Sequence, residues 1–541
     1  MSNQELKELG RRKEQGEIAR EELRGRNRQY LAWQHLTRNQ KEVAKRILAG
    51  RYEFLKDAGW GFLDKFMIFL KTVKFLDVLN VAGEGYVRRM ITVSKLLLTY
   101  QMKILLGISS MNQVPDTLFN DTGLLMLLGF TARQIKYGHS KRGKKRNGPM
   151  HKDTLADALE KFGSEEVEKI LNESVRVLNE GKFIDDDIYI CDPTDIETTE
   201  KCKGRGRKTI DEEHIDKKTG EKIVIPKTIY GFKLLVIRGV QSGIVVAAKM
   251  VKIQESEKNY TLRLIRLAQK NIGKKKIKVL VLDRGFIDGI TLWKMKHDFN
   301  IDFIIPATKV MDITKDARGL RDRGNEDGIW REEAEEITAL GIRGLTSYDQ
   351  YGDEKHNKEN RYNKTFRANP INVVMVIKWN REEYKRGKEK VFLTTLRVDK
   401  PVSVIKKYKL RSLIENTTFR ELKTGWLIDN IPKKTESAVR THVFLTVCMF
   451  NMCKAYRSQL GKEITEQGIR RFRRETFAQT KNKVVIIAEP YYGVFDLEEL
   501  MILVGKPPKY FMSISPKKFK EEYGLVPENA PSENKTTKEE S

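Results

Sequence analysis

Three acidic residues stand where a carboxylate can project from a rigid element. Asp192 follows the apolar run DDIYIC, Asp283 ends IKVLVLD, and Glu415 lies inside the predicted helix YKLRSLIENTTFRELK. Two aspartates at the carboxyl ends of strands and a glutamate on a helix can converge in one cleft of an α/β sheet. Carboxylates without thiol or imidazole suit Mg²⁺ or Mn²⁺. Two such ions, ~4 Å apart, support in-line phosphoryl transfer. These three acids are therefore candidates for both catalytic residues and metal ligands.

Other interpretations of these acids stay open. An aspartate at the end of a strand also serves as a turn or cap residue. Asp195 lies close to Asp192 in the chain and competes with it for the first metal position.

The predicted helix around Glu415 carries further groups suited to phosphate. Tyr408, Arg411 and Glu415 are spaced i, i+3 and i+7 and share one face of a regular helix. At ~100° per residue, Lys423 falls about 80° from Glu415. A carboxylate that holds a metal beside an arginine, a lysine and a tyrosine that grip phosphates makes a coherent site for a DNA end. The alternative is an ordinary amphipathic helix with i,i+4 charge pairs.

Local patterns predict the elements that must position these residues. Residues 1–180 are predicted to be helical, with apolar residues at three- and four-residue spacing. Over 183–310, strands and helices follow in the order βββαβαβ, which indicates a mixed sheet with helices on its faces. Residues 311–399 are predicted to be an inserted β-rich subdomain. Helices return over 400–460, and 461–541 form a C-terminal region with a polar tail that we expect to be mobile.

The charge of the chain indicates an anionic partner. Lys and Arg number 102 against 74 Asp and Glu, a formal net charge of +28 over 541 residues. With 40% hydrophobic residues the charge sits on a folded protein, so nucleic acid is the first candidate partner. Lys144, Lys145 and Arg146 lie in a cationic loop that contacts either solvent or phosphates. The four cysteines form no CxxC pair, and we find no leader or membrane-spanning segment, so we expect a cytoplasmic protein.

Three strings together resemble the catalytic blocks of bacterial insertion-sequence transposases of the DDE class. YICDPTDIETTEK resembles a strand ending in D-x-T, VLVLDRGFIDG the D-R-G-F block with Arg284, and YKLRSLIENTTFRELK the Y-x2-R-x3-E helix. The resemblance covers roughly residues 100 to 460. Tyr408, Arg411 and Glu415 match intact, whereas Lys423 lies eight residues after Glu415 and the commonest form of the block has seven.

The resemblance implies a fold, an activity and partners. It implies an α/β, RNase H-like mixed sheet with flanking helices, a β-rich segment inserted between the second and third acids, and an N-terminal helical domain that binds DNA. The activity would be transposition with two Mg²⁺ or Mn²⁺ ions, on terminal inverted repeats and target DNA. A homodimer on DNA is expected, because two ends are joined in one event, and the bound protein would be nucleoid-associated. Trp330 and Trp379 lie in the insertion, where relatives hold a flipped base on an aromatic residue; either can equally be a core residue.

Two other functions compete with transposition. A tyrosine recombinase is suggested by His35 and Arg38, but too few residues precede them for the domain that such an enzyme requires. A non-catalytic DNA-binding regulator derived from a transposase is the main alternative, and the presence of all three acids argues against it.

Overall fold

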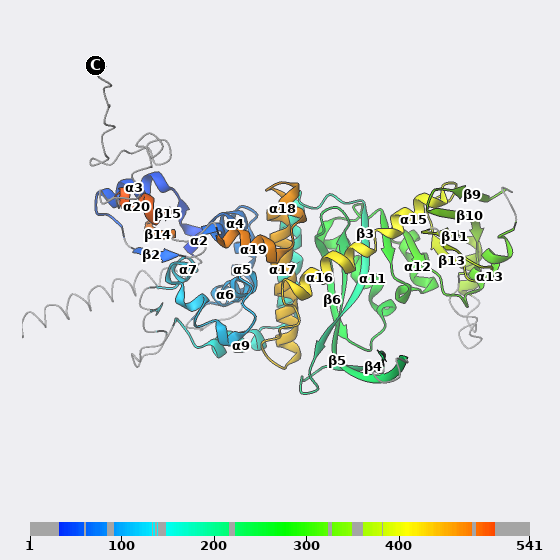
Figure 1. Ribbon diagram of the computed structural model, residues 1–541, viewed down its shortest axis with the longest axis horizontal. Coiled ribbons are helices and arrows are strands. Elements are labelled where there is room, and N and C mark those ends of the chain that lie inside the picture. Colours follow the sequence, from blue (N-terminus) through cyan, green and yellow to red (C-terminus); the bar gives the residue numbers. More distant parts are fainter. Residues whose placement is uncertain are drawn as a thin grey trace, which may run out of the picture. The chain divides into compact units, whose positions relative to one another are not determined.

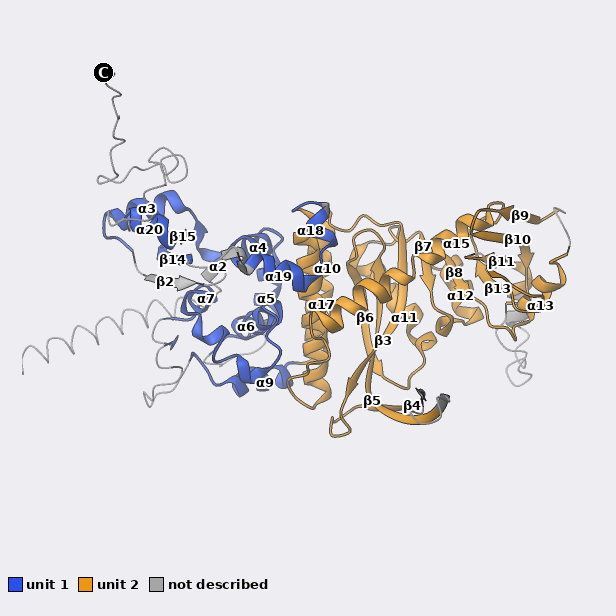
Figure 2. Cartoon of the chain, in the orientation of Figure 1, with its two compact units in different colours: residues 1–162, 460–541 blue, residues 163–459 orange. Residues whose placement is uncertain are grey.

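The chain forms two compact units in this computed structural model (Figures 1 and 2). Unit 1 comprises residues 1–162 and 460–541, and unit 2 comprises residues 163–459. The structure describes residues 32–52, 54–58, 61–83, 91–131, 134–135, 138, 148–215, 222–322, 327–348, 361–380, 382–478 and 483–503. The predicted N-terminal region ran to residue 180, but α10 (Ser164–Glu180) is part of unit 2, because its apolar face packs against α17 (Glu436–Ser458).

A four-stranded sheet in unit 1 is built from both ends of the described chain. Its order is β1-β15-β14-β2, with β14 antiparallel to both of its neighbours. The strands are β1 (Thr37–Arg38), β2 (Phe54–Ala58), β14 (Lys483–Ala488) and β15 (Tyr491–Asp496). The region predicted to be helical almost throughout therefore contains two strands. Their partners lie at the other end of the sequence, so no local pattern could show the pairing.

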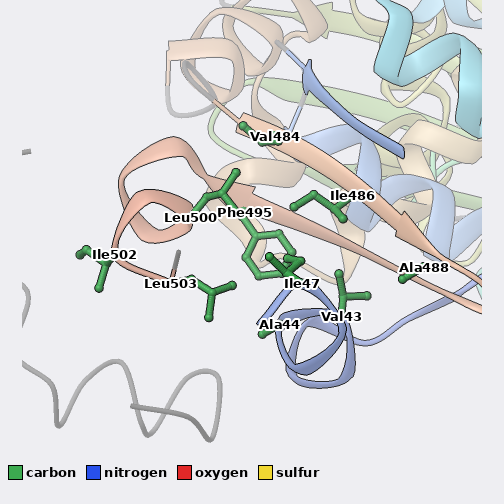
Figure 3. Packing of buried hydrophobic residues seen from close by; sticks show 10 residues of the cluster. All are labelled: Val43, Ala44, Ile47, Val484, Ile486, Ala488, Phe495, Leu500, Ile502 and Leu503. Carbon is green, nitrogen blue, oxygen red and sulfur yellow. The ribbon is translucent and has the colours of Figure 1, made fainter. Parts of the chain in front are cut away.

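A hydrophobic cluster covers one face of this sheet (Figure 3). Val43, Ala44 and Ile47 come from α3 (Gln40–Leu48), and they pack against apolar residues of the strands and of α20 (Leu497–Leu503). The Asn39 side chain accepts a hydrogen bond from the amide of Glu42 and so caps α3. The buried apolar area and the cap together fix α3 on the sheet.

Helix α6 (Val93–Leu105) of unit 1 is buried at every residue and packs against α5 and α9. Arg473 of α19 reaches the carboxyl end of α6, where its Nε donates to the Leu105 carbonyl (2.6 Å) and its Nη2 to the Ile104 carbonyl (2.9 Å). A cation at that end satisfies carbonyls that a helix leaves without partners. The other described helices of unit 1 are α2 (Ala32–His35), α4 (Gly61–Thr72), α5 (Phe75–Gly83), α7 (Thr122–Leu127), α9 (Lys152–Lys161), α18 (Lys462–Glu466) and α19 (Ile469–Ala478).

The sheet of unit 2 has the strand order of an RNase H-like fold. Its central strands are β3 (Ile188–Thr198), β5 (Lys222–Gly239), β6 (Val245–Lys252), β7 (Val279–Leu282) and β8 (Asp302–Pro306). They lie in the order β6-β5-β3-β7-β8. The first three run antiparallel, while β7 is parallel to β3 and β8 is parallel to β7. The mixed α/β sheet expected from the sequence is confirmed.

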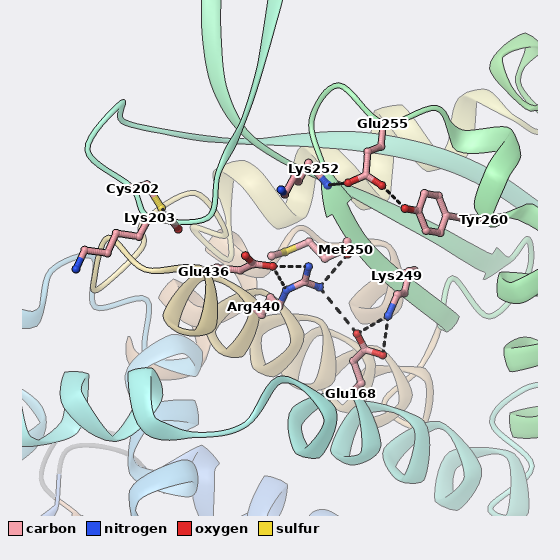
Figure 4. A network of polar contacts seen from close by, with 10 residues as sticks. All are labelled: Glu168, Cys202, Lys203, Lys249, Met250, Lys252, Glu255, Tyr260, Glu436 and Arg440. Atoms are coloured by element: carbon pink, nitrogen blue, oxygen red, sulfur yellow. Dashed lines mark hydrogen bonds and ion pairs between the residues drawn. The ribbon is translucent and has the colours of Figure 1, made fainter.

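Helices α10, α11 (Thr261–Ile272) and α17 pack with β6, and polar contacts tie α10 and α17 to it (Figure 4). Lys249 of β6 forms an ion pair with Glu168 of α10 (2.8 Å). Arg440 of α17 binds Glu436 (2.8 Å) and donates to the Met250 carbonyl (2.9 Å). These contacts fix the helical layer that supports the sheet.

The predicted insertion is β-rich, but it continues the same sheet. β13 (Lys390–Thr394) pairs with β8, and β11 (Ile371–Trp379), β10 (Ile337–Leu345) and β9 (Ile329–Glu333) follow outward, all antiparallel. The segment also contains α13 (Asp312–Gly319), α14 (Arg361–Ala368) and β12 (Glu382–Glu383). At the opposite edge, β4 (Gly206–Ile215) pairs with the first half of β5; the predicted βββαβαβ order did not include this strand.

Candidate active site

Adjacent strands bring the two aspartates together. β3 and β7 are parallel, and Cys191 lies in register with Leu282, so Asp192 and Asp283 follow neighbouring positions. Asp192 does not end its strand as predicted: β3 continues to Thr198, because it still pairs with β5 beyond the end of β7. Asp283 is the residue before a 3₁₀ turn, Arg284–Phe286. Asp192 is buried, with 3% of its surface exposed, whereas Asp283 is partly exposed.

Glu415 completes the group, and all three carboxylates face the guanidinium of Arg411. Its Nη1 lies 3.2 Å from both carboxylate oxygens of Asp192, 2.9 Å from Oε1 of Glu415 and 3.8 Å from Oδ1 of Asp283. The structure thus gathers the three acids that the sequence singled out around one cation.

Burial and like charge perturb the titration of this group. Burial, with the neighbouring charges of Asp283 and Glu415, raises the pKa of Asp192 to about 7, although Arg411 acts in the opposite direction. Burial lowers the pKa of Arg411, but the charges of Asp192 and its other neighbours outweigh this and raise that pKa above its usual value. Such perturbation is common at functional sites.

The helix that carries Glu415 is irregular. α15 (Pro401–Lys409) ends just after Tyr408, and two i→i+3 hydrogen bonds, from Leu410 to Lys407 and from Arg411 to Tyr408, tighten the chain there. A π-helical turn, Ile414–Phe419, follows and leads into α16 (Arg420–Thr424). The single regular helix predicted over this segment is therefore wrong. π turns are rare and frequently lie at functional sites.

The π turn changes the position of Lys423 relative to Glu415. One π turn adds a residue with almost no added rotation, so the eight residues from Glu415 to Lys423 turn about as far as seven do in an α-helix, roughly 700°. Lys423 then falls within ~20° of the direction of Glu415, instead of the 80° calculated for a regular helix. The extra residue that sets this segment apart from the commonest form of the block is absorbed in the turn.

Arg238 is a residue that sequence reasoning missed. It ends the apolar run FKLLVIR in β5, is 4% exposed, and its Nη1 donates to the Leu413 carbonyl (3.0 Å) and to the hydroxyls of Thr417 (2.9 Å) and Thr418 (2.8 Å). Its only signal in the sequence is a charge that closes an apolar strand.

The remaining predicted residues have different surroundings. Tyr408 packs against Phe392, with ring centroids 4.6 Å apart, and Arg284 is exposed directly after Asp283. Asp195 is three positions from Asp192 on the same strand and so points to the opposite face of the sheet. Lys144, Lys145 and Arg146 lie outside the described residues.

The two tryptophans of the insertion differ in their contacts. Trp379 stacks on Phe392 (6.2 Å between centroids), and the ammonium groups of Lys390 and Lys409 lie 5.1 and 5.4 Å from the centre of its ring. Trp330 lies half-buried on β9, opposite Gly341.

Three features elsewhere bear on other predictions from the sequence. Arg38, one of the two residues that suggested a tyrosine recombinase, forms an ion pair with Asp64 (2.7 Å) in unit 1 and so has a structural role. None of the four cysteines forms a disulfide, and all four are buried. Within the described segments, no helix is long and apolar enough to cross a bilayer.

The family model described as "Transposase DDE domain" matches residues 184–452, which span all three acids. No curated protein matches the chain. Among solved structures, a chain of the piggyBac transposase synaptic complex with hairpin DNA is similar, with a TM-score of 0.37, 8% identity, and coverage of 78% of this chain and 80% of that one. Residues 184–452 thus belong to the transposase DDE domain family.

Proposed function

We propose that this transposase binds the ends of its element, cleaves DNA with two divalent metal ions held by Asp192, Asp283 and Glu415, and transfers the 3′-OH ends to target DNA. The observation that carries the proposal is the convergence of the three carboxylates on one cation, Arg411. The partners would be terminal inverted repeats and target DNA, with the protein acting as a homodimer at the nucleoid.

The chemistry of the acids fits Mg²⁺ or Mn²⁺. The three side chains offer oxygen atoms alone, which hard divalent ions prefer. Within the described part of the chain no His, Cys, Asp and Glu side chains stand grouped closely enough to hold a metal as they are. The guanidinium of Arg411 lies among the carboxylates and has to withdraw before they can bind a metal together. When bound, the ions would lower the pKa of an attacking water and stabilise the leaving oxygen.

The residues around the acids would divide the handling of DNA. A backbone phosphate competes with the carboxylates for Arg411, because phosphate also accepts a bidentate pair from arginine. Binding of DNA would in this way free Asp192, Asp283 and Glu415. We assign phosphate contacts to Tyr408, Lys423 and Arg284, and to the cationic loop at Lys144, Lys145 and Arg146. Trp330 and Trp379 remain candidates for stacking on a displaced base.

The test is cleavage of a labelled duplex that carries the element's own end, with Mg²⁺ or Mn²⁺. Asp192→Asn, Asp283→Asn and Glu415→Gln should each abolish nicking and retain end binding in a gel-shift assay. Asp195→Asn is the matched control, since its carboxyl faces the other side of the sheet, and it should cleave like the wild type. Cleavage by all three acid variants would sink the proposal. If the wild type binds ends and never cuts them, the protein is a non-catalytic DNA-binding regulator.

A further inference from the structure

We propose that Arg238 is a positioning residue that stabilises the π turn at Ile414–Phe419 and thereby sets the direction in which Glu415 and Lys423 face the DNA end. This inference rests on the proposed function. It adds to it a residue from a different strand, one that touches neither the acids nor a DNA contact.

The contacts of Arg238 are concentrated on the π turn. One nitrogen, Nη1, has three acceptors there: the Leu413 carbonyl and the hydroxyls of Thr417 and Thr418. The Thr417 hydroxyl also donates to the Leu413 carbonyl. An i→i+5 turn breaks the regular i→i+4 ladder, and the backbone groups it displaces need other partners. Arg238 and Thr417 supply such partners to the Leu413 carbonyl.

The other end of the guanidinium is fixed by its own strand. Nε donates to the Gly239 carbonyl (2.9 Å) and Nη2 to the Val240 carbonyl (3.2 Å). Burial lowers the pKa of Arg238 to about 10, against the raising effect of Asp186 and Glu421, so it stays charged at neutral pH. A charge buried in this way is retained only where its hydrogen bonds are satisfied. Arg238 therefore links the end of β5 rigidly to the turn.

A second contact holds the segment after the turn. Glu421 of α16 binds Arg457 (3.0 Å) and Lys454 (3.3 Å) of α17, and Arg457 is fully buried. With α16 fixed at Glu421, the rotation between Glu415 and Lys423 depends on whether the chain between them forms a π turn or a regular α-helix. A regular α-helix over the same residues would separate them by about 80°, and the π turn reduces this to ~20°. Arg238 favours the second state.

The experiment compares two variants. The single variant carries Arg238→Met, and the double variant combines Arg238→Met with deletion of Thr417. Loss of the guanidinium should let the segment relax towards a regular helix, turn Lys423 away from Glu415 and slow end cleavage by roughly a hundredfold, the usual cost of a misplacement of about 1 Å. Deletion of Thr417 removes the extra residue, so a regular helix then brings the lysine back into line. The double variant should regain at least a tenth of the wild-type rate, which a merely structural role of Arg238 would not predict.

Hydrogen exchange of residues 411–423 gives a readout that needs no catalysis. Exchange there should be faster in Arg238→Met than in the wild type. Arg440→Met is the matched control, because this arginine also binds a carboxylate and a carbonyl of unit 2; it should leave the exchange of 411–423 and the cleavage rate unchanged. If Arg238→Met fails to fold, Thr417→Val with Thr418→Val keeps the arginine and should raise the exchange in the same direction.

Two results would overturn the inference. One is wild-type exchange over 411–423 in Arg238→Met or in the threonine variant. The other is a slow double variant that gains nothing from the deletion. Failure of the proposed function is distinct from both, because it would show as unchanged cleavage in Asp283→Asn.

Discussion

Replacement of Arg411 by methionine should increase the affinity of the DNA-free protein for Mn²⁺. Arg411 supplies the positive charge that faces all three carboxylates, at 2.9 to 3.8 Å. Each such pair is worth about 4 kcal/mol at an effective dielectric constant of 20. Asp283 and Glu415 are 40% and 51% exposed, so solvent screens much of this. A net gain of about 1.5 to 3 kcal/mol remains for a competing cation, or roughly ten- to hundredfold tighter binding.

The assay is titration of Mn²⁺ into the full chain without DNA, with free Mn²⁺ followed by electron paramagnetic resonance. Arg321→Met is the matched control, because Arg321 also pairs with a buried carboxylate, Glu389 (2.6 Å), in the same unit. It should leave the affinity unchanged. End cleavage by Arg411→Met should nevertheless fall, since the arginine is proposed to bind a phosphate. If Arg411→Met binds Mn²⁺ no more tightly than the wild type, the guanidinium does not compete with metal and the reasoning fails.

Three further results are expected. The pKa of Asp192 is raised to about 7 in the folded protein, so its carboxyl holds a proton more tightly there than in the unfolded chain. This contribution to stability is full below pH ~4 and is lost as the pH rises to about 7. Urea titrations between pH 4 and 8 should show this loss of stability in the wild type and not in Asp192→Asn. Phe495→Ala should lower the free energy of unfolding of unit 1 by about 3 to 5 kcal/mol, read from the loss of hydrogen-exchange protection in β14, and an unchanged β14 would contradict the packing in Figure 3. Trp379→Ala should destabilise unit 2 in thermal melts, because the ring stacks on Phe392 and contacts the Lys390 ammonium. Trp330→Ala should chiefly lower the quenching of 2-aminopurine placed at the cleaved end, and equal melts for the two variants would refute this difference.

Local patterns predicted the elements that carry the candidate acids. Asp283 follows a short apolar strand and Glu415 lies in a helical segment, as the sequence indicated. Asp192 lies on a strand, as predicted, but it does not end that strand, because β3 continues its pairing with β5. The βββαβαβ order predicted the central sheet, because each of its strands and helices shows a local pattern of its own.

The rest depends on contacts between distant segments. The pairing of β2 with β14 joins residues near opposite ends of the chain, and neither strand shows its partner in its own pattern. The π turn could not be predicted from helix periodicity, because it is stabilised by Arg238 from another strand. The angle calculated for Lys423 was consequently wrong, even though the residue itself was singled out.

The central claim is that three carboxylates together hold the metal ions for cleavage. The most direct test is the number of Mn²⁺ ions bound by the protein on a pre-cleaved end duplex, measured by electron paramagnetic resonance and corrected for Mn²⁺ bound by the duplex alone. The wild type and Asp195→Asn should each bind two ions per chain, and Asp192→Asn, Asp283→Asn and Glu415→Gln should each bind fewer. Equal numbers for all five proteins would show that the metal ions lie elsewhere, and the account would be wrong.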